Sequence, residues 1–544
     1  MRSSDRTVGV FTHSRPAVIT EVKMRSSISI VLILTLLFSF TACSVEGSAQ
    51  PNDTTDSVTT PIPDDTTIYY EEDELPKNLK FKGDTVRILS LDEEGAKNEL
   101  TVEFLTSDVV NDSVFNRELF VEDRLNVNIE NIKLTRDLYG KEIVRQHASD
   151  EDDYQIYAAS VGTLSGYVFE RYLTDLSASK HLDLSKPWWY DGFSTEAQLG
   201  DALYMATGSL SLTLIRSMYA TFYNKELAKS YASLNDDMSE LEDLYSVVNE
   251  GKWTYDTFYS LGSKVYTDLN GDTKRDSEDL YGIGISDAGT VNVFWSSFDI
   301  NIFSRTEADW FELDVNLDKL YSALELGYTL VNVTPQCYIP PKDGSLYDTL
   351  SAKFAGDTIL FMIDRLHSIE SFSLRDMQSD YGILPFPKYD ERQDEYHTFA
   401  GEDYTVFAIP TTCLDGDMTG AVLEALASYS YRYTAPAYLN VALKGKYMND
   451  PQSRKMLGIT VDGFTVDSAW IYRSTLAGNY PTVFSDLIAQ QKDTFASAHQ
   501  TAKDAVERAL ASHKYIIATA NEEADASEAG ASEADASEAG ASGE

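Results

Sequence analysis

The chain has few basic residues and few cysteines. Its 544 residues include 44 Lys and Arg against 87 Asp and Glu, which gives a net charge of −43. This charge disfavours nucleic acid and anionic membrane surfaces as partners, because both would repel the protein. The three cysteines, at positions 43, 337 and 413, form neither a disulfide framework nor a zinc-binding spacing. In an exported protein Cys337 and Cys413 could pair, or both could remain buried free thiols.

The sequence also lacks the motifs of common catalytic sites. It contains no G-x-S-x-G, no H-E-x-x-H and no phosphate-binding loop, and its seven histidines show no metal-ligand spacing. With 87 carboxylates, an acid/base pair can be drawn almost anywhere, so such a pair does not favour a glycosidase. The sequence therefore predicts a protein that is not an enzyme.

Long hydrophobic runs are scarce, and the longest one lies near the N-terminus. Ile28–Phe40 is a mostly apolar run of 13 residues, whereas a membrane-spanning helix needs about 20. Met24, flanked by Lys23 and Arg25, is the expected start of a signal peptide, and residues 1–23 are upstream sequence.

The run ends in Phe40-Thr41-Ala42-Cys43, which resembles a bacterial lipobox with Phe in place of the usual Leu. The resemblance implies a diacylated Cys43 at the mature N-terminus and stable anchoring through two acyl chains. The alternative is an ordinary signal peptide with an incidental cysteine.

Two segments are of low complexity. Residues 44–76 are rich in Thr, Asp, Ser and Pro, which is typical of a disordered tether. From Glu523 the ten-residue unit EADASEAGAS occurs twice, which predicts a disordered acidic tail.

Between these segments, strand patterns alternate with helix patterns. We expect strands at Thr85–Leu89, Asn126–Ile132 and Tyr154–Ser160, and an amphipathic helix over Asn111–Leu125. This alternation predicts an α/β fold with a largely parallel sheet and ligand sites at the carboxyl ends of its strands.

One later stretch, Tyr204–Leu227, combines a turn, a strand and the start of a helix. Thr207-Gly208-Ser209 can form the turn, and Met218–Tyr223 alternates in the way that a half-buried strand does. Asn224 offers an N-cap oxygen to the following YNKEL helix. Further along, Thr254 is expected to N-cap a helix, and a helix over Thr419–Tyr433 is expected to end before Pro436.

Several segments, in a compatible order, resemble the family 1 extracellular solute-binding proteins, the two-lobed receptors of ABC importers. The similar segments are the Tyr204–Leu227 crossing, Asn111–Glu130, Lys353–Met362, Gly382–Tyr389 (GILPFPKY) with Thr405–Pro410, and Asp467–Tyr472 (DSAWIY). They span roughly Phe81 to Leu510, whereas the long linker and the tail repeat are not part of the family pattern.

The resemblance implies an α/β, two-lobed periplasmic-binding-protein-like fold of type II, with mixed sheets flanked by helices and hinge crossings between the lobes. The expected segments are 1–43 (upstream segment and lipoprotein signal), 44–80 (tether), 81–208 (first lobe), 209–387 (second lobe), 388–440 (return to the first lobe), 441–515 (remainder of the second lobe) and 516–544 (tail).

Aromatic residues are the expected ligand contacts, because sugar rings stack on flat aromatic faces while carboxylates and amides bind the hydroxyl groups. The chain has 33 Tyr, 24 Phe and 6 Trp. We expect the ligand cleft to be lined by aromatic residues before the crossing, by polar residues after a strand of the second lobe, and by late aromatic residues. These are Trp188, Trp189 and Tyr190; Asp364, Arg365 and His367; and Trp470 and Tyr472. For any single Trp, the alternative is a place in the core.

The stretch Asp268–Asp279 (DLNGDTKRDSED) has the spacing of an EF-hand or dockerin-like calcium loop. Oxygen-bearing side chains occupy loop positions 1, 3, 5, 9 and 12, namely Asp268, Asn270, Asp272, Asp276 and Asp279. Thr273 stands where glycine usually makes the turn, and Asp279 replaces the usual Glu. The prediction is a structural Ca²⁺ ion, and the alternative is a solvated acidic turn.

The function predicted by the resemblance is that of a monomeric, lipid-anchored, extracytoplasmic receptor. It would bind a sugar or oligosaccharide and deliver it to the permease subunits of an ABC transporter. Two alternatives stay open: a calcium-containing surface enzyme acting on glycans, which turnover of polysaccharide would reveal, and a non-transport glycan-binding surface protein, which retention of import after its deletion would reveal.

Overall fold

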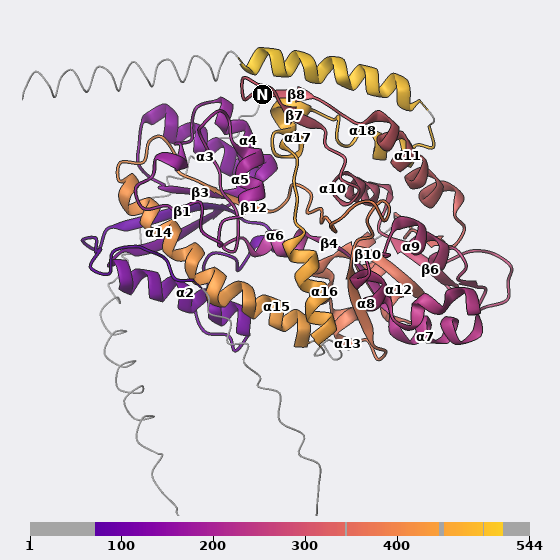
Figure 1. The fold of residues 1–544 in the computed structure, drawn as a ribbon. Helices are drawn as coiled ribbons and strands as arrows, with labels where there is room; N and C mark the ends of the chain where they lie inside the picture. The colour runs from indigo at the N-terminus through magenta and orange to yellow at the C-terminus, as the bar shows by residue number, and fades with distance from the viewer. Residues whose placement is uncertain (1–70, 343–344, 445–450, 493, 515–544) are drawn as a thin grey trace, which may run out of the picture. The chain divides into compact units, whose positions relative to one another are not determined.

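The computed structural model describes residues 71–342, 345–444, 451–492 and 494–514 (Figure 1). These residues belong to one compact unit, Tyr69–Glu544. The predicted signal peptide with Cys43, the tether up to residue 70 and the repeat tail lie outside the described residues. Within the described ranges, every helix is too short or too polar to cross a membrane.

The first sheet has the strand order β12-β3-β1-β2, with β1 (Thr85–Leu91), β2 (Asn128–Leu134), β3 (Ile156–Ser160) and β12 (Thr405–Ala408). β1 pairs in parallel with β2 and β3, and β12 is antiparallel to β3. Val86 and Ile88 of β1 pack with α2 (Val109–Leu125) and α14 (Gly416–Tyr429), whereas Leu89 and Leu91 pack with α3 (Arg136–Ser149) and α4 (Val161–Phe169). Both faces are therefore covered by helices, as Figure 1 shows, and the predicted strands and helix are confirmed.

The second sheet has the order β11-β4-β10-β6-β5, with β9 also pairing with β6. Its strands are β4 (Tyr219–Asn224), β5 (Tyr266–Thr267), β6 (Leu280–Ile285), β9 (Cys337–Tyr338), β10 (Ile359–Arg365) and β11 (Tyr381–Pro385). β10 is parallel to β6 and antiparallel to β4, so the sheet is mixed. The predicted fold class, mixed sheets flanked by helices, is confirmed.

The strand predicted in the crossing is β4, but it is almost fully buried rather than half-buried. It lies between β10 and β11 in the sheet, so neither of its edges is free. Asn224 N-caps α7 as expected, because its side chain accepts a hydrogen bond from the backbone N–H of Leu227 at 2.9 Å.

The remaining helices and the small third sheet connect and flank these two sheets. They are α5 (Asp191–Ala197), α6 (Leu212–Ser217), α7 (Lys225–Leu234), α8 (Leu244–Asn249), α9 (Tyr255–Gly262), α10 (Phe294–Ser297), α11 (Leu317–Tyr328), α12 (Leu346–Ala355), α13 (Phe372–Asp376), α15 (Ala435–Lys444), α16 (Pro451–Asp462), α17 (Ser468–Ile471), α18 (Val483–Ala489), and the β7 (Phe303–Arg305) and β8 (Phe311–Leu313) hairpin. Short helical turns η1 (Glu94–Ala96), η2 (Leu176–Ala178), η3 (Asp236–Glu242), η4 (Ala288–Val293), η5 (Thr329–Val333), η6 (Leu366–Glu370), η7 (Ser430–Thr434) and η8 (Arg473–Ala477) join them, and residues 495–514 form a final helix.

One predicted boundary is wrong. The helix expected to end before Pro436 continues, because α14 passes through the π-helical turn η7 into α15. Pro436 lies two residues after the π-helical turn η7, where the regular helical hydrogen-bond pattern is already interrupted. Lys353, at the start of the similar segment Lys353–Met362, lies in α12, where its ammonium group donates to the carbonyl oxygens of Ser277 and Asp279.

A buried carboxylate joins the loop after β1 to the segment that connects the two sheets. Glu99 is 1% exposed and accepts hydrogen bonds from the backbone N–H and hydroxyl of Thr213 in α6, at 2.7 and 2.8 Å. The hydroxyl of Thr405, at the start of β12, donates to its other oxygen at 2.5 Å. The fully buried Arg117 of α2 donates to the carbonyl oxygen of Glu99 at 2.6 Å. These hydrogen bonds connect α2, α6 and the start of β12 through Glu99.

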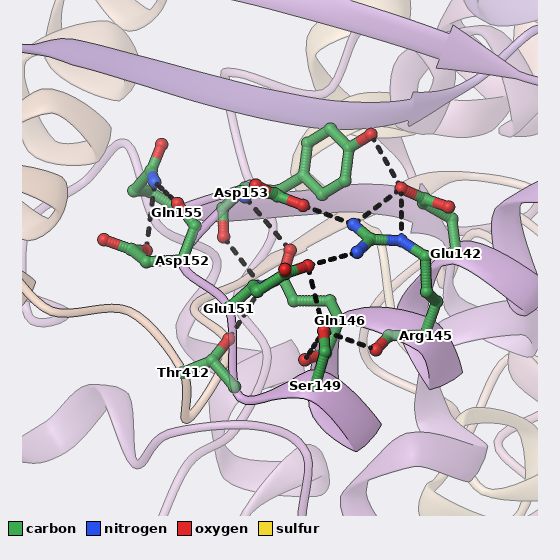
Figure 2. Close-up of polar contacts among 10 residues, drawn as sticks. Glu142, Arg145, Gln146, Ser149, Glu151, Asp152, Asp153, Gln155 and Thr412 are labelled. Carbon is green, nitrogen blue, oxygen red and sulfur yellow. Dashed lines mark hydrogen bonds and ion pairs between the residues drawn. The ribbon is translucent and has the colours of Figure 1, made fainter.

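At the opposite end of β3, an ion cluster orders the connection from α3 (Figure 2). Arg145 pairs with the carboxylates of Glu142, Glu151 and Asp153. Beside it, Gln146 donates to the hydroxyl of Thr412 at 2.7 Å. These contacts lie before the amino end of β3, away from the carboxyl edge of the first sheet.

The packed part of the chain begins before Phe81. Leu75 is buried against the first sheet, and Asp73 forms an ion pair with Arg124 of α2. Cys337 and Cys413 are free thiols, and burial raises the pKa of Cys337 to about 12. Of the two states left open for this pair, the structure has the unpaired one.

Three carboxyl groups in the packed helices have a strongly raised pKa. Burial raises the pKa of Glu118 and Glu424 from 4.5, and that of Asp467 from 3.8, to about 7 in each case. Glu424 accepts a hydrogen bond from the indole N–H of Trp189 at 3.0 Å. Because burial favours the neutral form of an acid, the native state binds protons that the unfolded chain releases.

We expect the free energy of unfolding to fall as the pH rises from about 4.5 to 7. Glu424 contributes roughly 3 kcal/mol at most to this loss. This contribution is fully present below the pKa of the unfolded chain and is lost as the pH passes the raised pKa of the folded state. Glu424→Gln, which is neutral at every pH, should show a smaller difference in melting temperature between pH 5 and pH 8 than the wild type. The exposed Asp137→Asn variant should keep the wild-type difference; an unchanged difference in Glu424→Gln would contradict the expectation.

Candidate functional site

A polar pocket of about 440 Å³ lies at the carboxyl edges of both sheets. Its lining comes from the loop after β1, the start of α2, the crossing helix α6, α12, η6, α13 and α15. The lining residues are Gly95, Lys97, Asn98, Asp108, Val110, Asn111, Arg216, Tyr347, Asp348, Ser351, His367, Ser368, Glu370, Ser371, Arg375 and Tyr438. Parallel α/β sheets place ligands at this edge, because the loops that follow the strands converge there.

Arg216 of α6 connects the two sides of the pocket. Its Nε atom pairs with Glu370 at 2.8 Å, and Nη1 donates to the carbonyl oxygen of Gly95 at 3.2 Å. Its guanidinium group also lies over the ring of Tyr438, 5.3 Å from the centroid. The crossing helix thus holds the loop after β1 and the loop after β10 in contact with one side chain.

The end of β10 places an acidic and a basic side chain, Asp364 and Arg365, next to each other. Asp364 is fully buried, and its carboxylate accepts hydrogen bonds from the hydroxyl of Ser368 at 2.7 Å and from the backbone N–H of Arg365 at 2.8 Å. Burial raises the pKa of Asp364. The guanidinium group of Arg365 lies over the ring of Tyr347, 4.3 Å from the centroid. Tyr219, at the start of β4, pairs with Arg365 in the sheet.

A second pocket, of about 370 Å³, lies at the same edge of the first sheet. Ser160 at the end of β3, Gly162 in α4 and Asp403 before β12 line one side, and Arg473, Ser474 and Asn479 line the other. Arg473 pairs with Glu402, and Arg136 pairs with Glu93 at 2.8 Å. Its arginines therefore already have carboxylate partners.

The three polar residues predicted for the ligand site lie together at the first pocket. His367 lines it and is exposed, Arg365 contacts the lining residue Tyr347, and Asp364 lies buried beneath them. They gather because η6 begins directly after β10 and turns back along the edge of the sheet.

The predicted aromatic residues before the crossing lie elsewhere. Trp188 is fully buried, with its ring 6.3 Å from that of Tyr431, and Trp189 is buried against Glu424. Tyr190 is partly buried and packs against Phe464, with ring centroids 5.8 Å apart. None of the three lines either pocket, so their contact with a ligand stays a prediction.

The late aromatic residues are also buried. Tyr472 is fully buried and donates a hydrogen bond to the carbonyl oxygen of Ala197. Trp470 packs edge-on against Phe399 at 5.0 Å, and Phe399 packs against Tyr219 at 6.1 Å. Trp470 is thus separated from the end of β10 by two rings, and its role in binding stays a prediction.

Several lining residues did not emerge from the sequence, among them Tyr347, Arg216, Asn98 and Asn111. Tyr347 lies in the first turn of α12, and Asn111 near the start of α2, where polar residues are ordinary. Arg216 lies in the crossing stretch singled out by the sequence, and Asn111 begins the predicted helix, but neither was predicted to contact a ligand.

The predicted calcium loop joins β5 to β6. The Asp268 carboxylate accepts hydrogen bonds from the backbone N–H groups of Gly271 and Thr273, at 2.6 and 2.8 Å. Thr273 has φ +65°, so it adopts the left-handed conformation for which glycine was expected. Asp279 is buried; its Oδ2 accepts from the hydroxyl of Tyr266 at 2.8 Å, and its Oδ1 has no partner among the described residues.

These features fit a cation in part. The loop has oxygen donors and the left-handed turn that such loops use. However, no group of three or more His, Cys, Asp or Glu side chains within the described ranges is placed to hold a metal ion. Calcium binding at this loop therefore stays a prediction.

Comparison with known proteins gives a fold but no close relative. No protein-family model matches the chain, and no curated protein matches it. Among solved structures, the chain is similar to the sugar-binding protein MalE from Xanthomonas citri, with a TM-score of 0.52, 13% identity, and coverage of 79% of this chain and 98% of MalE. It is also similar to M. tuberculosis UspC, with a TM-score of 0.51, 13% identity, and coverage of 78% and 100%.

At these identities the likeness concerns the fold. The similarity extends over nearly the whole length of both neighbours and over almost four fifths of this chain. The chain therefore has the two-lobed fold of the carbohydrate-type solute-binding proteins that its sequence resembles.

Proposed function

We propose that this protein is an extracytoplasmic, lipid-anchored solute-binding receptor of an ABC transporter. It binds a sugar or oligosaccharide in the pocket between the two sheets and delivers it, chemically unchanged, to a membrane permease. The observation that carries the proposal is the polar 440 Å³ pocket at the facing carboxyl edges of two sheets in a MalE-like fold.

The lining of the pocket suits a saccharide. Its side chains include donors and acceptors for hydroxyl groups, such as Asn98, Asn111 and Ser351, together with the aromatic rings of Tyr347 and Tyr438. Because the lining comes from both lobes, a ligand that contacts both would favour the closed arrangement, and closure would signal occupancy to the permease.

The anchor and the partners follow from the sequence. Cys43 would carry two acyl chains, and residues 44–70 would act as a tether between the membrane and the receptor. The receptor would work as a monomer, with permease subunits supplied by other chains.

A binding assay tests the function. Thermal-shift and calorimetric titrations against mono- and oligosaccharides, with peptides as controls, should identify a saccharide that binds. Tyr347→Ala and His367→Ala should each weaken its binding about tenfold or more, because they remove a stacking face and a polar contact. The melting temperature without ligand should change little.

Two controls sharpen this test. Trp188→Ala and Trp470→Ala should destabilise the protein by about 3–5 kcal/mol, because each empties a buried site; normal binding by both variants would remove these residues from the ligand site. Cleaved saccharide recovered by mass spectrometry, or binding of peptides alone, would contradict the receptor function.

We also propose that the Asp268–Asp279 loop binds a structural Ca²⁺ ion. The left-handed Thr273 and the buried, unpartnered Oδ1 of Asp279 support this proposal. A bound ion would stabilise the connection between β5 and β6.

Calcium titration tests this second proposal. After treatment with a chelator, added Ca²⁺ should release or absorb heat and raise the melting temperature, with a stabilisation of about 2.7 kcal/mol at a hundredfold excess over the Kd. Asp272→Ala should abolish both effects, whereas Asp309→Ala, an exposed carboxylate in the β7–β8 hairpin, should retain them. No heat and no change in melting temperature in the wild type would contradict it.

A further inference from the structure

Arg365 is an arginine without an anionic partner at the edge of the ligand pocket. It is partly buried at the end of β10, and its guanidinium group lies over the ring of Tyr347, which lines the pocket. Its Nε atom is buried and has no hydrogen-bond partner among the described residues, none of which forms an ion pair with it. The guanidinium group is thus held against an aromatic ring without an ion pair to the described residues.

Other partly buried arginines do have partners. Arg305 likewise lies over an aromatic ring, that of Phe311 at 4.7 Å, but its Nη2 donates to the carbonyl oxygens of Thr195 and Gln198 at 2.8 and 2.7 Å. Arg216 pairs with Glu370, and Arg473 pairs with Glu402. Desolvating a charge without a partner costs free energy, so an unpaired, partly buried arginine beside a pocket points to an anion supplied from outside the protein.

The charge of the pocket differs from that of the chain. The whole sequence has twice as many acidic as basic residues, whereas the pocket is lined by Lys97, Arg216 and Arg375 against Asp108, Asp348 and Glu370. Asp108 N-caps α2, and Glu370 and Arg216 pair with each other. Arg365 adds a further positive charge at the edge of this lining.

The carboxylates nearest to Arg365 do not replace the missing partner. Asp364 accepts hydrogen bonds from Ser368 and from a backbone N–H. Asp403 is close enough to interact with Arg365 electrostatically but forms no ion pair with it. Asp403 also lines the neighbouring 370 Å³ pocket, where it could accept hydrogen bonds from hydroxyl groups of the same ligand.

We propose that the ligand is an acidic saccharide whose carboxylate or sulfate group pairs with Arg365. The guanidinium group of an arginine can donate two parallel hydrogen bonds to the oxygens of such an anion. Because Nε of Arg365 is buried, the anion would bind its two Nη groups. The sugar ring that carries the anion would lie beside Tyr347. This inference rests on the proposed saccharide-binding function and names the class of saccharide.

The test compares ligands that differ only in charge. Calorimetric titrations of the whole protein would use tri-galacturonate and its fully methyl-esterified form, and a sulfated galacto-oligosaccharide and its desulfated form. The wild type should bind at least one charged member about ten- to hundredfold more tightly than its neutral counterpart. The pair that shows this preference identifies the anion as a carboxylate or a sulfate.

Substitutions of Arg365 test whether this side chain causes the preference for the charged ligand. Arg365→Met should abolish it, and Arg365→Lys, which keeps the charge but not the fork of donors, should restore only part of it. Arg145→Met, in the ion cluster at the far end of β3, should bind like the wild type. Without ligand, Arg365→Met should melt at or above the wild-type temperature, since it removes an unpaired charge, whereas a purely structural arginine would lower it.

The outcomes separate this inference from the proposed function. Neutral saccharides that bind as tightly as their charged counterparts, with Arg365→Met unchanged in affinity, would overturn the acidic ligand and leave the receptor function intact. Failure of the wild type to bind any saccharide in the binding screen would overturn the receptor function, and the acidic ligand with it.

Discussion

The buried carboxylate of Glu99 is the interaction on which the arrangement of this protein depends. A charge in the interior is tolerated only when hydrogen bonds replace its lost hydration, and Glu99 obtains them from Thr213 and Thr405. Arg117, fully buried beside it, donates to two carbonyl oxygens of the same loop, those of Glu99 and Leu100. These hydrogen bonds hold the loop after β1 against the crossing helix α6.

That constraint determines where the ligand pocket forms. With α6 held at the edge of the first sheet, Arg216 in the same helix reaches both the loop after β1 and Glu370 after β10. β4 follows α6 directly and pairs with β10, so the carboxyl end of β10 is brought to the same place. A saccharide bound in this pocket would contact the loop after β1, α6 and η6, but not Glu99 itself. Its binding energy could therefore shift the balance between the open and closed forms.

The sequence predicted the regular elements well, because hydrophobic periodicity and N-cap residues are local signals. Asp364, Arg365 and His367 were predicted from the resemblance to the family, and in the structure they lie at the end of the buried strand β10 and directly after it. The aromatic residues were less informative, since a large ring is equally suited to a sugar face and to the core, and Trp188 and Tyr472 are fully buried. Tyr347 and Asn111 were missed because only tertiary packing of α12 and α2 brings them to the pocket. Thr273 adopts the left-handed conformation although it is not a glycine, and local propensities do not predict this.

Hydrogen–deuterium exchange with and without a bound saccharide tests the central claim, that both lobes hold one ligand. The account predicts that residues 95–111 beside the first sheet and residues 347–375 beside the second gain protection together at the same ligand concentration. Protection confined to one of these segments, or found only at a distance from both, would contradict it.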